Sequence, residues 1–208
     1  MKKGVVQQEL LTTEDKIKNA AREVFLEKGF EKATTREIAE RLGMNRALMN
    51  YYFRTKEKLF DAIFEELLQQ FLASMHAVLT NEQNLRDKIK ALIDYEFTAF
   101  SEQPQLVALI VGEINRNPVR YQESVRRAIV QPMVLFDQQL QECIRQQKIR
   151  PINAEQLLDI IGSITSAYFI NKPVRMHVWQ MTESDFSASA QALKQAAIDI
   201  ILNGLFLE

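Results

Sequence analysis

The chain has 208 residues, of which 47% are hydrophobic and 25% are charged, and it contains 6 glycines, 5 prolines and one cysteine. These values are typical of a globular protein with one large or two modest domains, and the lone Cys143 excludes an internal disulfide. No apolar stretch is long enough to span a bilayer, and residues 1–13 lack a signal-peptide core. We therefore expect a cytoplasmic protein with no membrane partner.

Hydrophobic periodicity predicts helices along nearly the whole chain. The first predicted helix covers 14–28, and Gly29 follows its end. Further helices are expected over 36–42, 46–52, 56–79, 85–101, 104–115, 118–147, 154–171 and 185–207. No strand pattern is convincing, and 170–181 is the least regular stretch. The sequence therefore predicts an all-α protein of about nine helices.

Charge is distributed unevenly along the chain. Residues 1–60 hold 13 basic and 9 acidic residues, a net charge of +4, whereas residues 61–208 hold 13 and 18, a net charge of −5. A basic segment attracts polyanions, so this asymmetry favours a nucleic-acid partner for the N-terminal part alone.

Two short predicted helices lie close together in this basic part. Helices 36–42 and 46–52 are separated by Gly43-Met44-Asn45, the spacing of a helix-turn-helix. The apolar residues expected in its core are Ile38, Ala39, Leu42, Met44, Met49 and Phe53, packed against Val24 and Phe25. The side chains left pointing outward are Arg46, Ala47, Asn50 and Tyr51. In the major groove, arginine can bind guanine and asparagine can bind adenine.

Residues at the helix ends suit phosphate contacts, which fix the register of a protein on DNA without reading sequence. These residues are Thr35, Arg36, Tyr52 and Lys56. The alternative for the whole segment is a set of solvated side chains on a small helical bundle.

The same segment resembles the tetracycline-repressor (TetR) family of bacterial regulators over about residues 13–62. The resemblance is carried by Ala33-Thr34-Thr35-Arg36-Glu37-Ile38-Ala39, by Leu42-Gly43-Met44, and by Tyr51-Tyr52-Phe53-Arg54-Thr55-Lys56-Glu57-Lys58-Leu59. It implies a homodimeric transcription factor on a pseudo-palindromic operator in double-stranded DNA, more often a repressor than an activator. It also implies a three-helix DNA-binding domain over 1–55 and an effector-binding and dimerisation domain over 56–208.

In this family, bases are read from the positions that correspond to Arg46, Ala47, Leu48, Asn50 and Tyr51. This chain departs from the common pattern at three of them: Leu48 replaces a frequent threonine, Ala47 a frequent glycine and Asn50 a frequent tyrosine. Leu48 can touch a thymine methyl group or fill the core. The operator therefore cannot be copied from a relative.

Small and apolar side chains in the last two predicted helices allow two helices to approach closely. They are Gly162, Ser163, Ser166, Ala167, Ala192, Ala196 and Ile200. With the resemblance, they predict an intersubunit four-helix bundle; the alternative is a seam inside one chain.

Aromatic and apolar residues between 59 and 168 are candidates for an effector cavity or for plain core: Phe71, Met75, Phe97, Phe100, Phe136 and Tyr168. Glu96 and Glu113 fall on apolar helix faces, where an unpaired charge is costly. Each either receives a cationic or hydrogen-bonding ligand or pairs with an arginine. The candidate arginines are Arg116, Arg120 and Arg126.

The sequence bears on two other classes of protein. His76 and His177 follow no Glu-x-x-His or zinc spacing, and the chain has no glycine-rich phosphate loop, so we expect neither an enzyme nor a bound cofactor or metal. A DNA-binding adaptor of the same fold, controlled by a protein partner instead of a small ligand, stays open.

Overall fold

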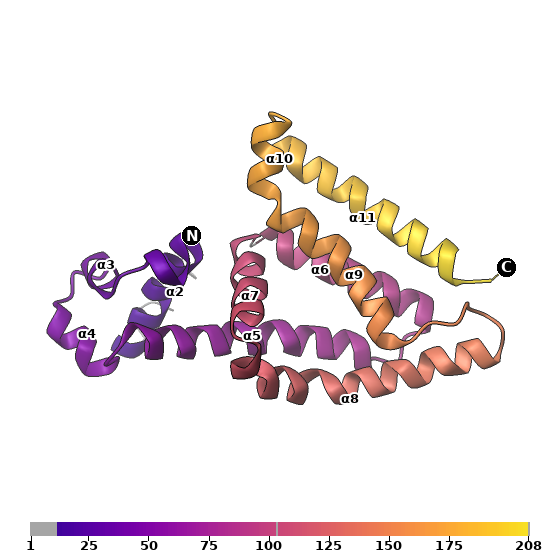
Figure 1. The fold of residues 1–208 in the computed structure, drawn as a ribbon, viewed down its shortest axis with the longest axis horizontal. Helices are drawn as coiled ribbons and strands as arrows, with labels where there is room; N and C mark the ends of the chain where they lie inside the picture. Colours follow the sequence, from indigo (N-terminus) through magenta and orange to yellow (C-terminus); the bar gives the residue numbers. More distant parts are fainter. Residues whose placement is uncertain (1–11, 103, 208) are drawn as a thin grey trace, which may run out of the picture. The chain divides into compact units, whose positions relative to one another are not determined.

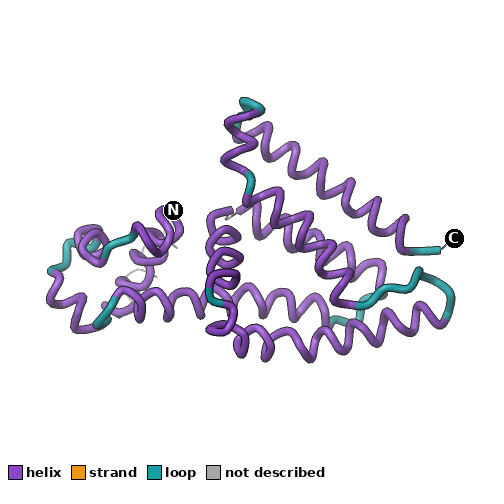
Figure 2. The backbone as a smooth tube through the Cα atoms, viewed as in Figure 1, coloured by secondary structure: helices purple, strands orange, loops and turns teal. Residues whose placement is uncertain are grey.

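The computed structural model describes residues 12–102 and 104–207, and it is helical almost throughout (Figures 1 and 2). The helices are α2 (Thr13–Lys32), α3 (Thr35–Arg41), α4 (Arg46–Tyr52), α5 (Lys56–Thr80), α6 (Leu85–Glu102), α7 (Pro104–Arg116), α8 (Pro118–Arg145), α9 (Ala154–Ile170), α10 (Lys172–Val178) and α11 (Glu183–Leu205). The predicted all-α class is confirmed. Pairing between strands is limited, in the described residues, to one isolated bridge between Ile149 and Phe206.

Two local features differ from the prediction. Helix α2 continues past Gly29, which adopts a φ of 73° inside it, so the glycine bends the helix and one more turn follows. The irregular stretch after α9 contains a further short helix, α10, with a proline in its first turn, where a missing N–H costs nothing. Apart from these, the predicted and observed helices correspond one to one.

The chain divides into two compact units, with the boundary after Leu68 inside α5. The first unit is built on α2, α3, α4 and the beginning of α5. Its core consists of fully buried side chains that include Ile17, Val24, Phe25, Ile38, Met49 and Leu59. The ring of Phe60 meets that of Phe25 edge to face, with centroids 5.0 Å apart, so α5 closes this core.

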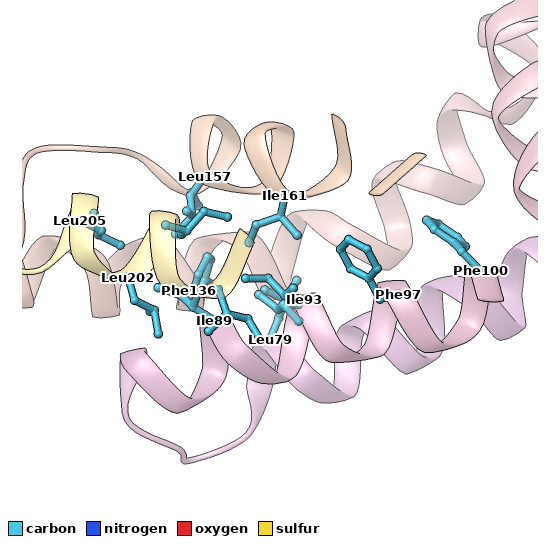
Figure 3. Packing of buried hydrophobic residues seen from close by; sticks show 14 of the residues in the cluster. Leu79, Ile89, Ile93, Phe97, Phe100, Phe136, Leu157, Ile161, Leu202 and Leu205 are labelled. Atoms are coloured by element: carbon cyan, nitrogen blue, oxygen red, sulfur yellow. The ribbon is translucent and has the colours of Figure 1, made fainter. Parts of the chain in front are cut away.

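The second unit packs α6 against α9 and α11, with α7 and α8 alongside α9. Figure 3 shows its hydrophobic cluster, in which Ile93 and Phe97 of α6 face Leu157 and Ile161 of α9. The loop after α8 is tied to the C-terminal end of α11 because Arg150 N–H donates to the Leu205 carbonyl at 2.8 Å. No described helix is long and apolar enough to cross a membrane.

Candidate nucleic-acid interface

The turn between α3 and α4 is set by a glycine in a left-handed conformation. Gly43 has a φ of 61°, its N–H donates to Glu40 O at 3.1 Å, and Met44 N–H donates to Ala39 O at 2.9 Å. This pair of bonds is the Schellman arrangement that ends a helix. Asn45 then caps α4, accepting the Leu48 N–H at 2.8 Å. The local sequence alone thus produces the predicted helix-turn-helix.

Helix α4 buries one residue and exposes most of the others. Met49 is fully buried and anchors the helix in the core of the first unit. The exposed residues are Ala47, Leu48, Asn50, Tyr51 and Tyr52. Leu48 is 42% exposed, which answers one open point: it does not fill the core. Four of the five predicted base-reading positions, Ala47, Leu48, Asn50 and Tyr51, are therefore exposed on α4. Arg46 is the first residue of this helix, and its side chain lies outside the described part of the structure.

Three of the four predicted phosphate contacts are accessible to different degrees. Thr35 is half-buried in the first turn of α3, behind the cap formed by Thr34. The Arg36 side chain is exposed, and its Nε lies 2.7 Å from Glu40 Oε1. Tyr52 is exposed and its ring rests edge-on against Tyr51 at 5.4 Å between centroids.

Lys56 has intramolecular partners that the sequence did not indicate. Its Nζ donates to the carbonyls of Phe30, Ala33 and Glu31 at 3.0, 3.2 and 3.4 Å, and it lies 4.3 Å from the Phe30 ring centroid. A lysine at the carbonyl end of a helix neutralises the negative pole of its dipole. Lys56 therefore joins the start of α5 to the end of α2.

A second link between α2 and α5 was also missed. Glu66 receives Lys18 at 2.9 Å and Arg22 at 3.4 Å, so one carboxylate bridges two basic residues of α2. Some basic residues of the N-terminal segment thus form ion pairs within the first unit and stabilise it. Glu66 lies 48 and 44 residues from Lys18 and Arg22, too far along the chain for a spacing pattern to link them.

In the second unit, the residues predicted for dimerisation are largely uncovered. Ser163, Ala167, Ala192, Ala196 and Ile200 are exposed, and Gly162 and Ser166 are half-buried. Ile200 is 71% exposed, which is unusual because isoleucine side chains are mostly buried in folded proteins. Sequence reasoning missed further exposed apolar residues on or beside the same helices: Ile160, Ile170, Val174, Val178 and Trp179.

Most residues predicted for an effector cavity belong to the hydrophobic cluster. Phe97, Phe100, Phe136 and Tyr168 are buried in it, and Phe71 and Met75 pack on its edge (Figure 3 shows the first three). The Tyr168 hydroxyl donates to Phe186 O at 3.1 Å, which satisfies its polar atom.

The two buried glutamates have different surroundings. Glu113 pairs with Arg116 and also accepts from Asn117 Nδ2 at 3.4 Å. Glu96 is 7% exposed, and its Oε2 has no hydrogen-bond partner among the described residues. Burial raises the pKa of Glu96 to about 7, against a smaller opposite effect of the Thr165 side chain. Only Glu113 thus follows the arginine alternative.

Comparisons with known proteins agree with this geometry. Residues 17–63 match the family described as bacterial regulatory proteins, tetR family. The fatty acid metabolism regulator protein of Bacillus subtilis is 22% identical over 189 residues, which are 90% of this chain and 92% of that protein. The transcriptional repressor NicS of Pseudomonas putida is 31% identical over 116 residues, about half of each chain.

Among solved structures, a TetR transcriptional regulator from Chloroflexus aurantiacus superposes with a TM-score of 0.70 at 18% identity and covers 97% of this chain and 98% of its own. That likeness shows the fold. With the match over 17–63, which spans α3, α4 and the turn between them, it confirms the resemblance found in the sequence. Residues 17–63 therefore resemble the DNA-binding segment of the TetR family of bacterial regulatory proteins, and the chain shares the fold of a solved TetR regulator.

Proposed function

We propose that this chain binds a pseudo-palindromic operator as a homodimer, represses transcription there, and leaves the operator when a small effector binds. The observation that carries the DNA-binding part is α4, a capped helix with one buried side chain and a solvent-facing row of candidate base readers. Residues 1–55 would serve as the DNA-binding domain and 56–208 as the effector and dimerisation domain. The protein would act in the cytoplasm, where the chromosome of a bacterium lies.

Arg46, Ala47, Leu48, Asn50 and Tyr51 are the proposed base-reading positions, and Thr35, Arg36 and Tyr52 the proposed phosphate contacts. Lys56 is assigned a supporting role, since its three ammonium hydrogens match the three carbonyl partners. Two copies are needed because one short helix reads too few base pairs for a unique site.

The proposed dimer surface consists of the seven predicted residues on α9 and α11. Its exposed apolar and small side chains support this assignment, because a lone chain gains nothing by leaving Ile200 in water. Two helices from each protomer would then form a four-helix bundle.

The proposed effector site centres on Glu96. Its carboxyl is buried, and Oε2 has no hydrogen-bond partner in the described part of the chain, which favours a ligand that donates a hydrogen bond or carries a positive charge. The names of relatives suggest lipid-like ligands as a starting set, because the full-length relative from B. subtilis regulates fatty acid metabolism. An adaptor controlled by a protein partner is the alternative.

Genomic selection of DNA fragments by the purified protein tests the proposal. We expect a recurrent inverted repeat, with genes beside it that point to the effector. Recovery of fragments without a shared sequence contradicts the operator. To test the effector site, the binding affinities of dodecylamine, dodecanol and dodecanoate are measured for wild type and for Glu96→Gln. Unchanged affinity of the variant for every binding probe removes Glu96 from the effector site.

A further inference from the structure

The outward face of α4 is more apolar than a solvated helix requires. Ala47, Leu48 and Tyr51 are exposed there, with Leu48 at 42% and Tyr51 at 80%; we name these three residues the α4 apolar patch. Met49 supplies the core contact of this helix, so the core does not need the apolar side chain of Leu48. Positions 48 and 51 are neighbours on a helix surface, so their side chains form one continuous patch.

The backbone that carries the α4 apolar patch is fixed within the chain itself. The Leu48 N–H donates to Asn45 Oδ1 at 2.8 Å, which fixes the first turn of α4. The Tyr51 ring rests edge-on against Tyr52, with an angle of 89° between the ring planes. A partner therefore meets a helix whose backbone is already formed, so binding does not have to order it.

The major groove offers one apolar group to such a patch, the C5 methyl of thymine. We propose that Leu48, supported by Tyr51, reads thymine methyl groups, so that each operator half-site carries a thymine at the position Leu48 contacts. Asn50, exposed on the same helix, is suited to the adenine of an A·T pair. The inference rests on the proposed function and adds which base edge the helix selects.

The experiment removes only the methyl group. Full-length protein selects duplexes from a random pool, and the recovered duplex is resynthesised with deoxyuridine in place of thymine, one symmetric pair at a time. Binding is measured by fluorescence anisotropy for wild type, Leu48→Ala and, as the matched control on the same helix, Asn50→Ala. Circular dichroism checks that each variant is folded.

At one symmetric pair we expect uracil to weaken wild-type binding about fourfold per half-site, the effect of one buried methyl group. Leu48→Ala should bind the thymine and uracil duplexes equally at that pair, whereas Asn50→Ala should keep the difference. Leu48→Thr, which retains a methyl group, should show an intermediate effect.

Equal sensitivity of wild type and Leu48→Ala at every thymine overturns the inference while DNA binding stands. The same result is expected if the α4 apolar patch binds a protein, because a protein surface gives Leu48 no role in telling thymine from uracil. If the selection recovers no preferred duplex at all, the proposed operator function fails instead. The two failures are therefore distinguishable.

Discussion

The ammonium group of Lys56 donates a hydrogen bond to the carbonyl oxygen of Phe30 at 3.0 Å and lies 4.3 Å from the centroid of the Phe30 ring. One phenylalanine thus holds the first residue of α5 through both its backbone and its side chain. Helices α2 and α5 directly precede and follow the helix-turn-helix in the chain. The contact therefore joins the two helices on either side of the candidate DNA-binding segment.

We expect Lys56→Ala to lower the free energy of unfolding of the first unit by about 1–3 kcal/mol, because the hydrogen bonds from a charged ammonium group to the carbonyls at the end of α2 are lost. Thermal unfolding by circular dichroism measures the change. Lys58→Ala, at an exposed position two residues on, is the control and should change little. A normal melting temperature, combined with a salt dependence of DNA binding that falls by about one phosphate, would restore Lys56 as a phosphate contact.

Arg46→Ala and Arg36→Ala should affect DNA binding in different ways. Removing a base reader relaxes preference at one position by about 1–3 kcal/mol, whereas removing a phosphate contact weakens binding to all sequences and flattens its salt dependence. Competition between selected and random duplexes at several salt concentrations separates the two effects. Identical behaviour of the variants contradicts the division into readers and anchors.

Glu96 should make stability depend on pH. Its pKa is raised from 4.5 to about 7 in the folded protein, so the folded state prefers the protonated carboxyl. The contribution of Glu96 to the stability of the fold is therefore fully present below pH 4.5. It is lost as the pH rises through about 7, and it stays lost at higher pH.

Between pH 5 and pH 8, Glu96→Gln should consequently gain stability relative to wild type, by about 3 kcal/mol at most. Denaturant unfolding at each pH measures the gain. Glu113→Gln, whose carboxylate is paired with Arg116, serves as the control and should show no such gain. Parallel pH profiles for wild type and Glu96→Gln would contradict the raised pKa.

Ile200→Asp should convert the proposed dimer into a monomer, since it places a charge in an apolar interface. Val119→Asp is the matched control: Val119 is 76% exposed on α8, against 71% for Ile200, and lies outside the proposed surface. Light scattering after size exclusion gives the mass of each variant. A dimer that survives Ile200→Asp moves the interface elsewhere.

Gly43→Ala should destabilise the first unit by about 1–2 kcal/mol, because its φ of 61° is strained for any residue with a Cβ. Apart from its chain neighbours, no atom of the described residues lies within 4 Å of the added Cβ, so the cost is backbone strain alone. Gly112→Ala, equally open but inside α7, should instead stabilise by up to about 1 kcal/mol. Equal changes for both variants would show that the turn tolerates side chains.

Several features of this protein were predictable because they depend on neighbouring residues. Helical periodicity, the caps at Thr34 and Asn45, and the glycine at 43 specify the helix-turn-helix within one short segment. Helix α10 was missed because its seven residues carry no buried face from which a pattern is read. The extent of α5 within the first unit was not visible either, since its periodicity continues unbroken past Leu68.

By itself, the sequence determined the helical class and the position of the helix-turn-helix, because both follow from spacing within a few turns. The residues proposed to read DNA stay a prediction from the same segment. Tertiary structure decided which side chains are buried and which distant residues form hydrogen bonds and ion pairs with one another. It gave Lys56 the carbonyls of α2, Glu113 an arginine, and the Glu96 oxygen no partner among the described residues, and it left Leu48 in solvent while Met49 filled the core. The physical reason is that burial and pairing depend on the three-dimensional packing of helices, which no local pattern records.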